Sequence, residues 1–336
     1  MKKILIVGSG FAGSVIARIL ADEGHLIEII DKRNHVGGNA YDYISEEGIR
    51  IHKYGPHIFH TNNERVFKWL SGFTNWIDYK HKVKALLSDG SFVTLPPNME
   101  TAEILGKENI VDILFRPYTK KMWGLDIEEL DSSILQRVPI RDDLNELYFP
   151  NDKYQVMPKD GYTQIFYKLL DSANIKVKTS TDFKKGMEDE YDHVFNSMPI
   201  DEYYDFKYGE LPYRSIKFKN VVLESPSLLP VPTINFTHDG PWTRVTEWKK
   251  YPNHGVNNYK TVLTFEEPCD YKENDFERYY PVKDISGNNR KKYEMYKNLS
   301  EDKMTFIGRC GLYVYLDMHQ AISSSMAVAK RYLKNL

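Results

Sequence analysis

The hydrophobic and polar positions at the start of the chain form three blocks. Apolar residues with branched side chains fill positions 4–7, which is typical of a buried strand. Apolar positions at helical spacing follow over 14–20, and a second apolar run occupies 26–30. The pattern therefore predicts a strand, a helix and a second strand, the order of a Rossmann-like unit.

The turn between the first strand and the helix carries the spacing G-x-G-x-x-G. Gly8 permits a tight turn, Gly10 lets the backbone approach a pyrophosphate, and Gly13 lets the helix pack on the strand. The free N–H groups and the positive dipole end of the helix would hold the pyrophosphate, next to Phe11 and Ala12. This segment predicts the phosphate-binding half of a dinucleotide site.

Asp31 ends the second strand, about 20 residues beyond the glycines, where a ribose-binding carboxylate belongs. A lone glycine motif is a weak signal, but strand, glycines, helix, strand and terminal acid together predict a dinucleotide site. The alternative is a tight turn without a ligand.

Later parts of the chain predict a second sheet. Two strand-like runs over 82–95 flank Asp89-Gly90, which is the signature of a hairpin. Residues 99–135 have a helical pattern. Strands are predicted to return to the first sheet at 175–179 and 193–197, and an antiparallel sheet is predicted from 213–218, 233–237, 242–247 and 260–265. A final helix follows Asp317, a plausible N-cap.

Composition excludes some classes of function. A net charge of −2 over 336 residues gives no nucleic-acid footprint, and no apolar run approaches the length of a membrane span. Two cysteines without C-x-x-C spacing suggest a reducing compartment, so we expect a cytoplasmic protein. His52, His57 and His60 lie close together in sequence but lack ligand spacing, and we predict no metal.

The loop after Asp31, over 32–40, is basic and contains paired glycines. Here the sequence resembles the FAD-binding flavoproteins of the glutathione-reductase and amine-oxidase kind. The stretch Ile51–Asn62 (IHKYGPHIFHTN) is more specific and resembles the UDP-galactopyranose mutase family. Further matching segments extend the resemblance over nearly the whole chain: Tyr118–Gly124, Arg137–Arg141, Tyr148-Phe149, Tyr154-Gln155, Gly161-Tyr162 and Tyr279–Val282, with Asp160 replacing the usual first glycine.

The resemblance implies an α/β fold, with a Rossmann-like FAD-binding domain, a second mostly antiparallel sheet and a small helical domain. It places the FAD-binding domain in residues 1–75, 171–205 and 303–336. The substrate domain would take 76–97, 148–170 and 206–302, and the helical domain 98–147.

The resemblance also implies an activity: interconversion of UDP-galactopyranose and UDP-galactofuranose by an isomerase that uses FAD in its reduced form, FADH⁻. N5 of the reduced flavin would form a covalent adduct with the anomeric carbon of the sugar and expel UDP. NAD(P)H or another reductant would keep the flavin reduced. The partners implied are thus a nucleotide sugar and a reductant, with neither nucleic acid nor membrane.

Site residues follow from the same resemblance. Arg141 and Arg244 would flank the diphosphate, because a guanidinium binds phosphate oxygens bidentately. His57 would lie near flavin and sugar, and Tyr118 would stack on uracil. The other substrate-binding residues would be Trp123, Tyr154, Asn235, Thr237, Tyr280 and Tyr315. The catalytic residues would be Arg141, Arg244, His57, Tyr280, Tyr315 and Asp317. The other cofactor-binding residues would be Lys32, Arg33, Gly38, Asn39, Ile58, Arg309, Asp317 and Met318.

One departure from the family pattern concerns the segment from Asn98 to Tyr118. It leaves room for about two short helices, whereas the family carries a longer helical domain with a mobile lid and a dimer contact. A homo-oligomer remains compatible with the family, but its usual contact region is shortened. The alternatives are a mutase for a different nucleotide sugar, an amine-oxidase-like oxidoreductase that shares only the FAD domain, and a non-enzymatic flavin-binding relative.

Overall fold

The computed structural model describes residues 1–130, 139–299 and 301–336. Arg137, part of one matching segment, lies outside these residues. Among the described helices, none combines the length and the apolar character needed to cross a lipid bilayer.

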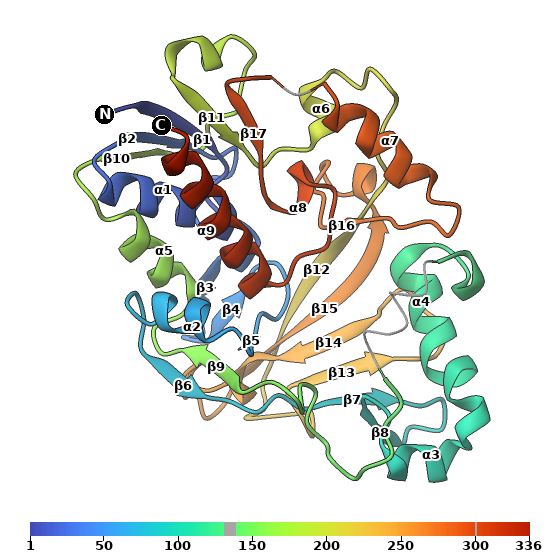
Figure 1. The fold of residues 1–336 in the computed structure, drawn as a ribbon. Coiled ribbons are helices and arrows are strands. Elements are labelled where there is room, and N and C mark those ends of the chain that lie inside the picture. The colour runs from blue at the N-terminus through green and yellow to red at the C-terminus, as the bar shows by residue number, and fades with distance from the viewer. Residues whose placement is uncertain (131–138, 300) are drawn as a thin grey trace.

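The first layer is a parallel five-stranded sheet (Figure 1). Its order is β10 (Ile175–Lys178), β2 (Leu26–Ile30), β1 (Lys3–Val7), β11 (His193–Asn196) and β17 (Met304–Phe306). β1 is buried along almost its whole length because helices cover the sheet, as parallel sheets require. The predicted return of residues 175–178 and 193–196 to this sheet is confirmed.

Helices α1 (Phe11–Asp22), α5 (Tyr162–Leu170) and α9 (Met318–Lys334) pack on this sheet. The predicted face of the last helix is confirmed, since Ile322, Met326 and Ala329 are buried. We predicted 148–170 within the substrate domain, but α5 from this range packs against α1. The division into domains stays a prediction.

A seven-stranded sheet forms the second layer. The order is β16 (Tyr280–Pro281), β12 (Tyr213–Leu223), β15 (Thr261–Asp270), β14 (Arg244–Glu247), β13 (Thr233–Phe236), β7 (Val83–Leu86) and β8 (Phe92–Leu95). All pairs are antiparallel except β13 with β7. The hairpin around Asp89-Gly90 is therefore confirmed as β7–β8, and the sheet is mostly antiparallel as predicted.

Smaller elements connect the two layers. β3 (Asp42–Ile44) pairs with β4 (Arg50–His52), and β9 (Tyr154–Pro158) lies between β5 (Phe59–Thr61) and β6 (Trp76–Asp78). The remaining α-helices outside the helical segment are α2 (Glu64–Leu70), α6 (Ile200–Tyr203), α7 (Asn288–Lys297) and α8 (Gly308–Gly311).

The helical segment lies beside the β7–β8 end of the second sheet (Figure 1). It contains α3 (Met99–Leu105), a π-helix at Val111–Phe115 and α4 (Arg116–Trp123). Pro117 lies in the first turn of α4, the part of a helix that tolerates its missing N–H. The predicted fold class is confirmed in its three parts.

Candidate active site

A cavity of about 910 Å³ lies between the carboxyl ends of the parallel strands and the second sheet. Its wall combines β1 and the start of α1 with residues from α4, β13, β14 and β15. Ligands of open α/β folds bind outside the carboxyl ends of the strands, so the fold positions this cavity as a ligand site. A single cavity spans both layers.

The glycine turn forms one end of the cavity. α1 begins after Gly10, and none of the described side chains caps its first N–H groups. A Cβ at Gly13 would lie 2.0 Å from the carbonyl oxygen of Gly8, so only glycine permits this packing of helix on strand. Gly10, Phe11 and Ala12 line the cavity. The turn therefore fits the pyrophosphate of a dinucleotide, with open backbone donors at a helix N-terminus.

Asp31 is buried beside this turn. Its carboxylate accepts hydrogen bonds from Ser9 N–H at 2.8 Å and Ser9 Oγ at 2.6 Å, and from Arg33 N–H at 3.0 Å. These donors fix the carboxylate at the cavity wall, where a ribose hydroxyl of the dinucleotide would reach it.

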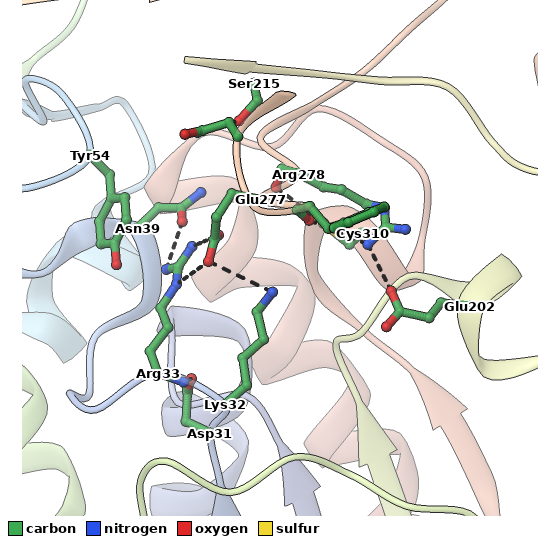
Figure 2. Close-up of polar contacts among 12 residues, drawn as sticks. Asp31, Lys32, Arg33, Asn39, Tyr54, Glu202, Ser215, Glu277, Arg278 and Cys310 are labelled. Carbon is green, nitrogen blue, oxygen red and sulfur yellow. Dashed lines mark hydrogen bonds and ion pairs between the residues drawn. The ribbon is translucent and has the colours of Figure 1, made fainter. Parts of the chain in front are cut away.

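The basic loop after Asp31 has an arrangement that the sequence did not indicate (Figure 2). Lys32, Arg33, Gly38 and Asn39 all line the cavity. The guanidinium of Arg33, however, is engaged by the carboxylate of Glu277, by Asn39 Oδ1 at 3.0 Å and by the ring of Tyr54 at 4.1 Å. Protein groups thus already surround this cation.

The middle of the cavity is formed by His57, Ile58, Arg309, Asp317 and Met318. His57 Nδ1–H donates to Gly55 O at 2.8 Å, because a carbonyl can only accept, which leaves Nε2 as the unprotonated nitrogen. Burial lowers the pKa of His57 to about 4, so the ring is neutral at pH 7. Asp317 is the N-cap of α9, as predicted, and its N–H donates to Gln320 Oε1 at 2.9 Å.

The end of the cavity against the second sheet carries cations and phenols. Arg244 on β14 donates to Tyr118 Oη on α4 at 3.1 Å. Arg309 lies over the rings of Tyr280 and Tyr315 at 5.4 and 4.6 Å, and these two rings stack. Trp123 meets Tyr280 edge-on, and Asn235 also lines this end. Burial raises the pKa of the Tyr280 hydroxyl, which keeps it a donor.

Glu266 on β15 is a site residue that sequence reasoning missed. It is buried in the cavity wall, 3.8 Å from Arg244, and within the described structure its Oε1 has no hydrogen-bond partner. Burial raises the pKa of its carboxyl, and the charge of Arg244 opposes this shift. Glu266 is the cross-strand partner of Arg244, so only the β14–β15 register identifies it.

Other missed residues also line the cavity. Tyr54 and Tyr148 belong to segments that resemble the family, which was the available signal, whereas His81 and Glu277 lie outside those segments. Tertiary packing alone brings His81 and Glu277 to the cavity.

Three predicted substrate residues are not brought to the cavity wall. The Arg141 guanidinium donates to the backbone carbonyls of Asn145 and Leu147, and Thr237 Oγ1 donates to Leu86 O at 2.9 Å. Tyr154 stacks on Phe67 with ring centroids 3.8 Å apart. Each side chain is used for local packing instead. In the described ranges, no group of three or more His, Cys, Asp or Glu side chains is arranged to hold a metal ion.

A Rossmann-like sheet with an open glycine turn, joined by one cavity to an antiparallel sheet rich in arginine and tyrosine, defines a protein of the flavin-enzyme fold class. Residues 6–73 match the model of NAD(P)-binding Rossmann-like domains. Residues 113–315 match the model of the UDP-galactopyranose mutase family, and the chain belongs to this family of isomerases.

Individual relatives agree with the family model. A dTDP-fucopyranose mutase from Escherichia coli is 35% identical over 383 positions, covering 100% of this chain and 99% of the relative. A probable UDP-galactopyranose mutase from Klebsiella pneumoniae is 34% identical, covering 100% and 96%. The crystal structure of a reduced UDP-galactopyranose mutase has the same fold, with a TM-score of 0.76 at 16% identity and coverage of 100% and 94%.

Proposed function

We propose that this protein is a reduced-flavin-dependent mutase that interconverts UDP-galactopyranose and UDP-galactofuranose. The observation that carries the proposal is that one cavity joins the open glycine turn to the Arg244, Tyr280 and Tyr315 group. A flavin dinucleotide at the first end would bring its ring system toward a nucleotide sugar at the second. When bound and reduced, FAD supplies a nucleophilic N5 for the anomeric carbon.

The residues of the chain would bind, orient and stabilise charge. Departure of UDP places negative charge on a phosphate oxygen, and the cation of Arg244 would stabilise that charge in the transition state. The protonated hydroxyl of Tyr280 would donate to the same diphosphate. His57 would accept a hydrogen bond from a sugar hydroxyl through Nε2, since this nitrogen carries no proton. The positive end of α9 would favour the anionic form of the flavin.

A second candidate substrate has specific support. The E. coli relative is named a dTDP-fucopyranose mutase and is as similar to this chain as the K. pneumoniae relative. A dTDP-linked 6-deoxy sugar would differ from UDP-galactose at C6 of the sugar, at the 2′-hydroxyl of the ribose and at the methyl group of the base. Such differences are worth only about 1–3 kcal/mol each, so both substrates belong in the assay. Full-length similarity to mutases argues against the amine-oxidase-like and non-enzymatic alternatives.

The experiment that tests the proposal is one assay on the purified protein. We expect a yellow protein that converts UDP-galactofuranose to UDP-galactopyranose only after reduction by dithionite or a nicotinamide donor. Chromatography of the nucleotide sugars measures the conversion, with the oxidised protein as the matched control. Equal activity in both redox states would contradict the proposal. Conversion of dTDP-fucofuranose alone would show that the substrate is not UDP-galactose, while the protein would remain a reduced-flavin-dependent mutase.

A further inference from the structure

The segment Asn274–Tyr279, here called the strap, links the two ends of the cavity. At its start, Asn274 Nδ2 donates to Ser215 Oγ at 2.9 Å and to Ile216 O at 3.1 Å on β12. At its end, Tyr279 precedes Tyr280, the first residue of β16. Asp275 and Phe276 have φ values of 49° and 57°, a left-handed conformation that costs energy for residues other than glycine. Surrounding contacts must hold this conformation.

The strongest of these contacts comes from the other layer of the protein (Figure 2). The Glu277 carboxylate accepts hydrogen bonds from Nε (3.3 Å) and Nη2 of Arg33. Lys32 Nζ lies 3.7 Å from Glu277 Oε1. The Arg33 side chain is 13% exposed and that of Glu277 is 22% exposed, so water screens this pair little. Burial alone would raise the pKa of Glu277, but the hydrogen bond from Arg33 lowers it.

Arg33 also contacts Tyr54, which belongs to the segment leading to His57. Its guanidinium lies over the ring of Tyr54, which in turn meets Tyr279 edge-on at 6.0 Å. Tyr54 directly precedes Gly55, the residue whose carbonyl fixes the His57 ring. One buried cation in the cofactor loop therefore touches the strap and the segment leading to His57.

The rest of the strap is fixed by further contacts, so a displacement of Glu277 would also displace Tyr279 and Tyr280. Arg278 pairs with Glu202 at 2.7 Å, and Arg309 donates to Tyr279 O at 3.0 Å. Tyr279 N–H donates to Arg214 O at 3.1 Å. Arg309 is the same side chain that lies over Tyr280 and Tyr315. Two residues separate Glu277 from Tyr280 along an otherwise fixed backbone.

We propose that Glu277 and Arg33 are positioning residues that couple the cofactor end of the cavity to the nucleotide-sugar end. Asp31, Lys32 and Arg33 stand at the end that would take the adenosine half of the dinucleotide. A ligand there would hold the loop that carries Arg33, and the contact between Arg33 and Glu277 would keep the strap, with Tyr279 and Tyr280, in place. If bound cofactor strengthens binding of the nucleotide at the sugar end by some factor, linkage requires that bound nucleotide strengthen cofactor binding by the same factor. The inference rests on the proposed function for the identity of the two ligands.

The test uses the holoenzyme and measures how fast FAD leaves after dilution, followed by flavin fluorescence, with and without UDP. In the wild type we expect UDP to slow FAD release by about tenfold, within the usual range of coupling between sites. Glu277→Gln keeps the shape of the side chain but removes its charge, and we expect the effect of UDP to fall below about twofold. Glu273→Gln, an equal change at an exposed position four residues earlier, should keep it.

A second measurement separates positioning from a purely structural role. At full flavin occupancy, Glu277→Gln should raise KM for the nucleotide sugar several-fold and leave kcat nearly unchanged. If that variant does not fold, Arg33→Lys keeps the cation, loses the two-pronged contact and should give the same result. A lower melting temperature with an unchanged effect of UDP would overturn the inference.

The outcomes for the proposed function are distinct. If the wild type converts no nucleotide sugar but UDP still slows FAD release through Glu277, the proposed function fails and the inference stands. If FAD release from the wild type ignores UDP, the inference fails whatever the turnover.

Discussion

At the scale of single residues, the site contains a pair of opposite charges, of which Glu266 is buried and Arg244 is partly exposed. Arg244 and Glu266 face each other across β14 and β15 at 3.8 Å, and both line the cavity. A guanidinium stays charged when buried, so this cation is available for a diphosphate. The carboxyl beside it has an oxygen that, within the described ranges, no protein donor satisfies, which leaves it open to a ligand hydroxyl or amide.

Arg244→Ala should lower kcat by about 10²-fold or more, because a cation aimed at developing phosphate charge is lost and Glu266 loses its partner. The flavin should stay bound, since the glycine turn lies at the other end of the cavity. Steady-state turnover together with the visible spectrum checks this. Arg65→Ala, an exposed arginine on α2, is the control, and near-normal turnover of Arg244→Ala would contradict the role.

At the scale of elements, α4 forms a wall of the sugar end and is fixed to the second sheet. Lys121 Nζ donates to three carbonyls of the β13–β14 turn, those of Phe236, His238 and Trp242, each at 2.9 Å. Arg214 on β12 donates to the carbonyls of Lys121 and Met122 at the end of the helix. These contacts hold Tyr118 and Trp123 at the cavity.

Lys121→Met should raise the Kd for UDP several-fold and change kcat little, because α4 loses all three donors that lock it to the turn. A hydrogen bond to a charged group contributes about 1.5–3 kcal/mol net, so losing part of this energy is enough to raise the Kd several-fold. Titration of UDP followed by tryptophan fluorescence measures Kd.

The matched control for this prediction is Lys120→Met on the same helix. Lys120 is exposed and pairs with Asp126 at 3.1 Å, which is a surface ion pair of small value. We expect the Kd for UDP to stay unchanged in this variant. Equal effects of the two substitutions would show that the charge of the helix, rather than the hydrogen bonds from Lys121 to the β13–β14 turn, sets the affinity for UDP.

The length of the chain bears on the same element. The alignment with the E. coli relative runs over 383 positions against the 336 residues of this chain, a difference of 47. The comparison thus agrees with a chain shorter than this relative, and the location of the difference between Asn98 and Tyr118 stays a prediction.

At the scale of the whole molecule, buried neutral histidines connect the site to stability. Burial lowers the pKa of His57 and of His254 to about 4 from an ordinary value of 6.5. His52 joins them, accepting from His57 N–H at 3.0 Å and meeting His254 at 3.0 Å. Burial disfavours the protonated form of each ring.

We therefore expect acid sensitivity. Below pH 6.5 the unfolded chain binds protons at His57 and His254, whereas in the folded chain these two rings stay neutral until about pH 4, so the free energy of unfolding falls as pH falls through this window. The loss between pH 7 and 5 should be about 2 kcal/mol per ring. Urea unfolding at both pH values measures it. His254→Gln should show a shallower dependence, and a stability independent of pH would contradict the prediction.

The sequence by itself determined the features that arise within short stretches. The strand, glycine turn and helix of the Rossmann-like unit occupy fewer than about 30 residues, and their spacing follows from backbone geometry. The Asp89-Gly90 hairpin and the Asp317 cap are also local, because turns and helix ends depend on a few neighbouring residues. Most of the residues that we predicted to bind the cofactor lie close to these signals, and they line the cavity.

Tertiary structure alone decided the contacts between distant segments. The register of β14 on β15 brings Glu266 to Arg244, and packing of the layers brings Glu277 to Arg33, 244 residues away. It also turned Arg141 toward carbonyls of its own loop instead of the cavity. A motif fixes residue types but not the direction of a side chain, which depends on strand register and on which partner satisfies a buried polar group first.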